Sequence, residues 1–283
     1  MTLAQPAVPP PPPVSERSLP ALTLSGAKRD LVLDPPWTNA AGTLGFSDEA
    51  RRLVDLARLG ALVTNPISLA PRTPARGPRL LRYPGGFALH TGHPNPGLSE
   101  VLRRHRRRWA RLPCPVIVHL LASTADEVRR MVERLEALDE VAGLEVGLGD
   151  ADAPLAAALV SAAVASQRPV LAQFPFTAPE SVAHAAAEAG AAALVLGAPR
   201  GALPAAGGRV RGRLYGPGLL PLLLHALEGL AGEAYAPLIA GAAIDSPAAH
   251  DAARAAGARA VQFDSALWQA PEVVLGSGRM LEG

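Results

Sequence analysis

The stretch PESVAHAAAEAGAAALVL, from Pro179 to Leu196, decides the fold. Alanine-rich residues that favour a helix lead to Gly190, and a continuous apolar run follows. Pro179 suits the first turn of a helix, and Gly190 suits the left-handed position just past its end. The apolar run is typical of a strand buried on both faces. The stretch therefore predicts a helix followed by a strand of a parallel sheet.

The helix, Gly-Ala, strand order returns at Gly257-Ala258, and eight strand-like runs can be counted. Such repeated units are typical of a parallel sheet covered by helices. Ser123 or Thr124, Thr177 and Ser246 stand just before expected helices, where N-caps are wanted. The expected strands are Asn39 to Thr43, Ala61 to Thr64, Pro115 to Leu120, Gly143 to Gly147, Pro169 to Phe174, Ala192 to Leu196, Pro237 to Gly241 and Ala260 to Phe263. The expected helices include Asp48 to Leu59, Ala125 to Leu138, Pro154 to Ser166, Pro179 to Ala189, Leu219 to Leu230 and Pro247 to Ala256.

Eight such units predict an α/β fold, a (β/α)8 TIM barrel, which typically needs about 250 residues. Residues 1–20 hold the run Pro9 to Pro13 and little apolar periodicity, so we expect a Pro-rich, disordered extension. Residues 21–283 are expected to form a single barrel domain. Any active site of such a barrel lies at the C-terminal ends of its strands.

Composition limits the function classes. Hydrophobic residues make up 49% of the chain and charged residues 18%, which predicts a globular protein. A net charge of +2 is not a nucleic-acid signal by itself, and Lys28 is the only lysine among 27 basic residues. No apolar run approaches the roughly 18 residues of a membrane span, and no signal peptide is visible. Together with the single Cys114, these features favour a cytoplasmic protein.

Short motifs in a fixed order carry a family resemblance. Ala40-Ala41-Gly42-Thr43-Leu44-Gly45-Phe46, Gly60-Ala61-Leu62-Val63-Thr64 and Asn95-Pro96-Gly97 are followed by Gly216-Pro217 and by the last two strands. Over about residues 22–281 the chain resembles the dihydroorotate dehydrogenase family. The resemblance implies a barrel that binds FMN and oxidises dihydroorotate to orotate in pyrimidine biosynthesis.

Several positions depart from the family's pattern. Its catalytic Cys or Ser falls near Asp150. Asp150 or Asp152 could accept the proton, but an Asp with an ordinary pKa near about 3.9 is a weak base for a C–H bond. The favoured interpretation is that Gly149-Asp150 caps the following helix. The family's two active-site lysines correspond to Asn65 and Gln173, which carry no charge. One substrate asparagine aligns near Leu89, the third-strand asparagine corresponds to His119, and Asn95 is retained.

The two turns that bind the flavin phosphate in the family are also changed. The first reads Ala240-Gly241-Ala242-Ala243, and the second reads Phe263-Asp264-Ser265, which brings a carboxylate to an anion site. Repulsion of the phosphate predicts weak or absent FMN binding unless an arginine of the loop after the sixth strand compensates. The resemblance implies substrate contacts at Asn95 and His119. It implies cofactor contacts at Ala41, Gly42, Thr43, Asn65, Gln173, Gly216, Gly241, Ala242, Asp264 and Ser265.

Three other sequence features suggest different functions. His90, His93 and His119 could form a metal-dependent hydrolase site with nearby carboxylates, but they lack the spacing of a helix-borne zinc motif, so we expect no metal. The arginines between Arg103 and Arg108 more often form the solvated face of a helix with Trp109 turned inward than a nucleic-acid surface. The Gly/Arg-rich segment from Gly207 to Gly212 is typical of a flexible lid or an anion-binding loop, and a simple flexible surface loop is the favoured interpretation.

Two function classes remain. The first is a family relative that has lost dihydroorotate oxidation and serves as a scaffold or regulatory subunit, as a homo-oligomer or with a catalytic paralogue. The second is an FMN-dependent oxidoreductase, acting on dihydroorotate or on an altered substrate. The joint loss of the base, both lysines and the glycine turns favours the first.

Overall fold

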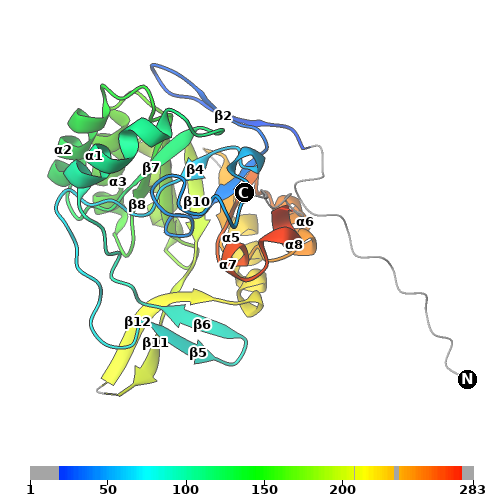
Figure 1. Cartoon of the computed structure of the whole chain (residues 1–283). Coiled ribbons are helices and arrows are strands. Elements are labelled where there is room, and N and C mark those ends of the chain that lie inside the picture. Colours follow the sequence, from blue (N-terminus) through cyan, green and yellow to red (C-terminus); the bar gives the residue numbers. More distant parts are fainter. Residues whose placement is uncertain (1–18, 207, 233–235, 276–283) are drawn as a thin grey trace, which may run out of the picture.

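Eight parallel strands form the central sheet of the computed structural model, which describes residues 19–206, 208–232 and 236–275 (Figure 1). The sheet closes into a barrel because Thr38 bridges Ala61, and the Gly60 N–H donates to the Trp37 carbonyl at 2.9 Å. The strand order is β3 (Trp37–Asn39), β14 (Ala260–Phe263), β13 (Leu238–Gly241), β10 (Ala193–Gly197), β9 (Val170–Pro175), β8 (Gly143–Gly147), β7 (Val116–Leu120) and β4 (Leu62–Val63). The predicted (β/α)8 barrel is confirmed.

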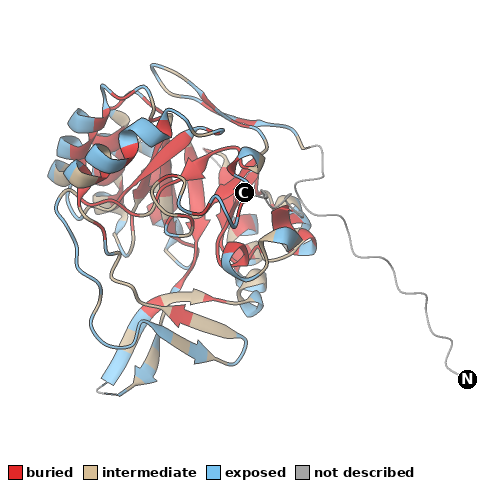
Figure 2. Cartoon of the chain, viewed as in Figure 1, coloured by how far each residue is buried: buried red, intermediate tan, exposed pale blue. Residues whose placement is uncertain are grey.

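Helices surround the barrel, and buried residues concentrate on its strands (Figure 2). Ser246 caps α6 as predicted, and Thr124, one of the two predicted candidates, caps α2 in place of Ser123. Asp152, not Gly149-Asp150, caps α3. The helix α4 begins after Pro179 without a side-chain cap from Thr177. The helices are α1 (Leu98–Trp109), α2 (Ala125–Leu135), α3 (Ala153–Val164), α4 (Glu180–Glu188), α5 (Leu220–Ala231), α6 (Pro247–Ala255), α7 (Ala266–Gln269) and α8 (Pro271–Leu275), with 3-10 turns η2 (Leu56–Arg58) and η3 (Pro217–Leu219).

The helix expected over Asp48 to Leu59 is wrong. This segment forms successive turns that end in η2. The Val54 N–H donates to the Ala50 carbonyl at 3.0 Å as in an α-helix, whereas the N–H groups of Leu53 and Arg58 donate to carbonyls three residues back. The side chain of Asp55 accepts a hydrogen bond from the Ala57 N–H and starts η2 at that point. Local capping by Asp55 therefore replaces a continuous helix.

A hairpin closes the end of the barrel where its strands begin. It consists of β1 (Leu22–Leu24) and β2 (Leu31–Leu33), whose buried leucines join Ile117 and Leu171 in one apolar cluster. The predicted N-terminal extension precedes this hairpin, and its residues 1–18 lie outside the described residues. Within the described part of the chain, no helix is long and apolar enough to cross a membrane.

An antiparallel sheet stands at the opposite end, next to the C-terminal ends of the barrel strands (Figure 1). This mouth sheet has the order β11 (Arg200–Ala205), β12 (Gly208–Tyr215), β6 (Gly86–Leu89) and β5 (Leu80–Tyr83). The flexible loop predicted over Gly207 to Gly212 is wrong for residues 208–212, because they pair with β11 on one side. Regular strand pairing thus positions the arginines of this segment.

Candidate functional site

A layer of polar side chains fills the barrel near the ends of its strands. Alternate residues of a strand point to the same face, so His119, Gln173 and Gln262 follow the interior residues Ile117, Leu171 and Ala260 two positions on. Glu145 completes this polar layer. His119, Glu145 and Gln262 are each 2% exposed or less. The barrel interior is apolar where the strands begin and polar at their C-terminal ends, which form the mouth of the barrel. The candidate site therefore lies at the mouth.

Two glycines make room for these side chains, and a third, Gly241, is packed against an apolar neighbour. A Cβ on Gly197 would lie 2.1 Å from Nε2 of Gln173, and one on Gly147 would lie 2.7 Å from Nε2 of His119. A Cβ on Gly241 would meet Val195 at 2.9 Å. Larger residues on β8 or β10 would therefore displace the polar layer.

Glu145 is the centre of the layer. Its Oε1 lies 2.7 Å from Nδ1 of His119, and its Oε2 accepts a hydrogen bond from Nε2 of Gln262 at 2.5 Å. An ionised carboxylate only accepts hydrogen bonds, so Nδ1 of His119 carries the hydrogen and its Nε2 is left for another group. The carboxylate holds the imidazole in one orientation, as in an acid–base dyad.

A cavity of about 40 Å³ lies above this layer. At about 10–15 Å³ for the centre of each water, it holds about three waters or an anion of similar size. Among the described residues, none hydrogen-bonds to Nε2 of His119 or to the amide of Gln173. The cavity is lined by His93, His119, Leu121, Gly147, Gly149, Gln173, Pro175, Ala198, Arg200 and Arg213.

The mouth sheet supplies the cations of this cavity. Arg213 of β12 lies 3.2 Å from both ring nitrogens of His93 and 3.5 Å from the Ala41 carbonyl, and Arg200 contacts Asp150 at 3.3 Å. Burial and the neighbouring charge of Arg213 together lower the pKa of His93 to about 2, and burial is the larger cause. His93 is therefore neutral and serves as an acceptor for the guanidinium.

The predicted phosphate turns do not fit a phosphate. Asp264 is 4% exposed, and its carboxylate accepts hydrogen bonds from the Ser265 N–H at 2.5 Å and from the Ser265 hydroxyl at 3.3 Å. Burial raises the pKa of Asp264 to about 6, while a backbone hydrogen bond from Ala243 opposes the rise. No arginine of the described residues forms an ion pair with Asp264. The carboxylate takes up backbone donors that an anion would need.

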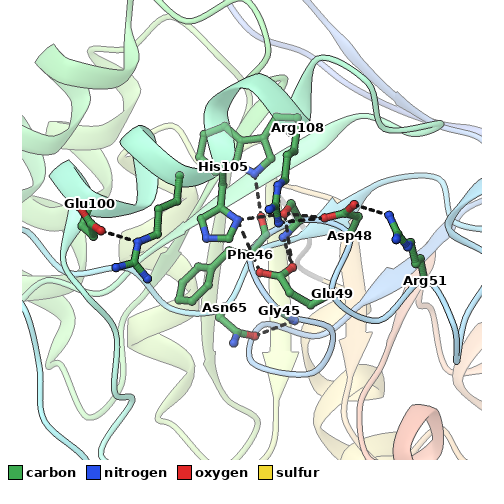
Figure 3. Close-up of polar contacts among 12 residues, drawn as sticks. Gly45, Phe46, Asp48, Glu49, Arg51, Asn65, Glu100, His105 and Arg108 are labelled. Atoms are coloured by element: carbon green, nitrogen blue, oxygen red, sulfur yellow. Dashed lines mark hydrogen bonds and ion pairs between the residues drawn. The ribbon is translucent and has the colours of Figure 1, made fainter.

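The other residues predicted to contact the flavin take part in local hydrogen bonds or close backbone contacts. Gly42 has a φ of 92°, and the hydroxyl of Thr43 donates to the Ala40 carbonyl at 2.7 Å. Ala41 carries the Arg213 contact, and Oδ1 of Asn65 accepts from the Gly45 N–H at 3.2 Å (Figure 3). Beyond the barrel, Gly216 has a φ of 146° and lies so close to β6 that a Cβ would be 2.1 Å from the Gly85 carbonyl. Ala242 is fully buried after β13, beside Gly241. None of these predicted positions is among the residues that line the mouth cavity.

Asn95, which the resemblance implies as a substrate contact, uses its side-chain amide for hydrogen bonds within its own loop region. Its Oδ1 accepts from the N–H groups of Gly97 at 2.9 Å and Ser68 at 3.2 Å. Its Nδ2 donates to the Ser68 hydroxyl at 2.9 Å. The amide therefore fixes the approach to α1 and is not among the cavity-lining groups.

A second polar cluster lies outside the barrel, against α1 (Figure 3). Nδ1 of His105 lies 2.9 Å from the buried Ser47 hydroxyl and 3.5 Å from Glu49. Activation of a serine by a His–carboxylate pair uses two different ring nitrogens, whereas here both partners meet the same one. We interpret the cluster as an anchor of the loop before β4. The neighbouring surface hollow of about 630 Å³ is lined by Asp48, Arg51, Arg108, Arg111 and Leu112.

Four of the five arginines of α1 form ion pairs with acidic neighbours, among them Arg108 with Asp48. Arg103 and Arg104 contact Glu100, and Arg106 contacts Glu140. Trp109 is buried and donates to the Phe46 carbonyl at 2.7 Å, as the solvated-face interpretation predicted. In the described part of the chain no three His, Cys, Asp or Glu side chains gather as metal ligands do.

Two members of the polar layer were not singled out from the sequence. Glu145 interrupts the apolar run of the fourth strand, and Gln262 interrupts the eighth. Each lies at a strand position that faces the barrel interior. The alternation of side chains along a strand is the sequence signal that could have identified both residues. Only the closed barrel brings them together.

Fold and site define the protein class as a (β/α)8 barrel with a polar mouth beneath an added antiparallel sheet. A sequence model of the family described as dihydroorotate dehydrogenase matches residues 27–153. The catalytic subunit of dihydroorotate dehydrogenase B (NAD(+)) from Desulforudis audaxviator is 34% identical over 260 residues, covering 83% of this chain and 84% of the relative. The protein of the same name from Pelobacter propionicus is 32% identical, covering 89% and 91%.

A crystal structure of a DHODH from Eimeria tenella in complex with ferulenol shares the fold, with a TM-score of 0.72 over 88% of this chain and 81% of that chain at 17% identity. The chain belongs to the dihydroorotate dehydrogenase family. The resemblance drawn from its motifs is confirmed by the two long relatives.

Proposed function

We propose that this chain is a family member that has lost dihydroorotate oxidation and acts as a scaffold or regulatory subunit. The observation that carries the proposal is the buried carboxylate of Asp264, which accepts the backbone donor of the turn after β14. An anionic phosphate brought to that turn would meet like charge in a site from which water is excluded. FMN binding is therefore expected to be weak or absent.

The proton-transfer side of the reaction supports the same proposal. Asp150 has a side chain that is 71% exposed and is ion-paired with Arg200, and Asp152 caps α3. Exposed carboxylates lack the desolvation that makes a carboxylate a strong base. Asn65 and Gln173 bring no positive charge to replace two lysines. Each lost acid–base or electrostatic contribution typically costs about 10²–10⁴ in rate.

A partner follows from the proposed loss of activity. The relatives carry the name of a catalytic subunit, so a chain of this family without the reaction would act beside an active one. We propose a catalytic paralogue as that partner, with a homo-oligomer as the simpler assembly.

The second candidate is an FMN-dependent oxidoreductase with an altered substrate. It is favoured by the loop Ala41-Gly42-Thr43, which keeps the family's first flavin segment and a φ of 92° at Gly42. The main argument against this candidate is the buried carboxylate of Asp264, which would repel the phosphate of FMN.

The visible spectrum of the purified full chain separates the two candidates. Colourless protein with no turnover of dihydroorotate and an artificial electron acceptor is expected. The double variant Asp264→Gly with Ala242→Gly should then gain FMN affinity, whereas Asp245→Asn, which leaves Asp264 in place, should not. Yellow protein with near-stoichiometric FMN would place the oxidoreductase first and end the scaffold proposal.

A further inference from the structure

The surface hollow beside α1 is separate from the mouth of the barrel and has the size of a ligand site. It is lined by Asp48, Arg51, Arg108, Arg111 and Leu112, none of which lines the mouth cavity. Its walls come from the turns before η2 and from the end of α1 with the residues that follow it. The volume of about 630 Å³ lies within the roughly 300–1,000 Å³ that is typical of small-molecule sites.

Three arginines share one carboxylate in this hollow. Nη1 of Arg51 lies 3.1 Å from Oδ2 of Asp48, and Nη1 of Arg108 lies 3.3 Å from Oδ1 of the same residue, so both guanidinium groups point toward Asp48 (Figure 3). The next carboxylate along the chain, Glu49, does not line the hollow and accepts a hydrogen bond from the Ser47 N–H at 2.7 Å. With three positive charges and one negative charge, the lining side chains carry a net charge of +2.

Arg111 has a charge that the fold does not use. Its backbone N–H donates to the Arg108 carbonyl at 2.9 Å, but its exposed side chain forms no hydrogen bond or ion pair within the part of the chain that the structure describes. Arg108 lies in the last turn of α1, where it interacts favourably with the helix dipole and with Asp48. Arg111 follows the helix and has no such acidic partner, so its guanidinium group is available to a ligand.

We propose that this hollow binds a small phosphate monoester of about the size of a nucleoside monophosphate, held by Arg51, Arg108 and Arg111. A phosphate monoester carries a charge of about −1.5 to −2 at pH 7, which balances the charge of +2 around the hollow. A guanidinium group matches the oxygens of a phosphate in bidentate, charge-assisted hydrogen bonds.

The size of the hollow favours an organic phosphate over the free ion. Its volume of about 630 Å³ is much larger than the cavity of about 40 Å³ at the mouth, which holds about three waters or an anion of similar size. The organic part of the ligand would lie along Leu112 and the apolar stems of the arginines. The inference goes beyond the proposed function, because it concerns a different place on the molecule.

The test is isothermal titration of AMP into the full-length protein in a phosphate-free buffer of low ionic strength. A single saturable site with a Kd on the order of 0.1 mM is expected. Adenosine lacks the phosphate, and inorganic phosphate leaves most of the hollow unfilled, so each should bind at least about tenfold more weakly than AMP. Equal binding of AMP and adenosine, equal binding of AMP and inorganic phosphate, or no saturable binding of AMP would overturn the proposal.

Two arginines close together in the chain decide whether the site is local. Arg111→Gln should weaken AMP binding at least about tenfold without changing thermal unfolding, because its side chain has no partner among the described residues. Arg107→Gln is the matched control. Arg107 is an exposed residue of α1 that does not line the hollow, and its loss should alter AMP binding less than about twofold. Equal losses in the two variants would show general attraction of anions and overturn the site.

Asp48 provides a test that a folding defect cannot imitate. Its carboxylate orients Arg51 and Arg108 but repels an anion in the hollow. Asp48→Asn keeps one oxygen acceptor and removes the charge, so AMP binding should become at least about threefold tighter. Binding that is unchanged or weaker in Asp48→Asn would contradict an anion site beside this carboxylate.

The visible spectrum of the same sample keeps this inference apart from the proposed function. Colourless protein that does not bind AMP refutes the phosphate site and leaves the proposed loss of flavin standing. Yellow protein whose AMP binding depends on Arg111 supports the phosphate site and refutes the scaffold proposal.

Discussion

Replacing Asp264 by Asn should change how the stability of this protein depends on pH. Burial raises the pKa of Asp264 to about 6 from an ordinary 3.8. The folded protein then keeps a proton between about pH 4 and pH 6 that the unfolded chain has released, so the free energy of unfolding falls as pH rises through this window. The difference corresponds to about 3 kcal/mol when the carboxylate is fully ionised at pH 7.

Asn keeps the shape and one oxygen acceptor for the Ser265 N–H but does not ionise. Relative to the natural chain, Asp264→Asn should therefore gain about 2–3 kcal/mol of stability between pH 4.5 and pH 7. Guanidinium denaturation of both proteins at four pH values in this range measures the gain. Asp126→Asn, at an exposed site on α2, is the matched control and should show no such trend. A stability difference that is constant with pH would refute the burial of an ionisable Asp264.

Two further predictions concern packing around the mouth. Gly216→Ala should destabilise the protein by at least about 2 kcal/mol, because its φ of 146° and a Cβ 2.1 Å from the Gly85 carbonyl are both unfavourable. Gly218→Ala, which meets nothing within 4 Å, should change thermal unfolding little, and equal effects would contradict the argument. Glu145→Leu should cost about 3–5 kcal/mol in denaturant unfolding, because it leaves His119 and Gln262 buried without their acceptor. A loss below about 1 kcal/mol would mean that the polar layer is not built around Glu145.

Local sequence signals located most of the barrel because its strands and helices follow simple rules. Apolar runs such as Ala260 to Phe263 and stops such as Gly190, with a φ of 98°, depend on residues close together in the chain. The same rules failed over Asp48 to Leu59, where the side chain of Asp55 caps a short turn and ends any longer helix. Helix propensity is a weak signal, and a single local hydrogen bond can override it.

Local sequence signals did not predict the strands of the mouth sheet or their pairing. β12 pairs with β6 across more than a hundred residues of chain, and the Gly/Arg-rich composition of β12 is not typical of a strand. Pairing partners so distant are decided by how the loops meet above the barrel. Strand propensity depends on that context more than helix propensity does.

The sequence by itself determined the barrel, the family and the departures from the family's pattern at Asn65, Gln173 and Asp264. Each of these follows from the order of residue types along the chain. The tertiary structure decided which of these groups act together. It joined His119, Glu145 and Gln262 across three strands, and it brought Arg213 from the mouth sheet to the Ala41 carbonyl. Hydrogen bonds and charges act over a few ångströms of space, whatever the separation along the chain, so only the closed barrel shows their partners.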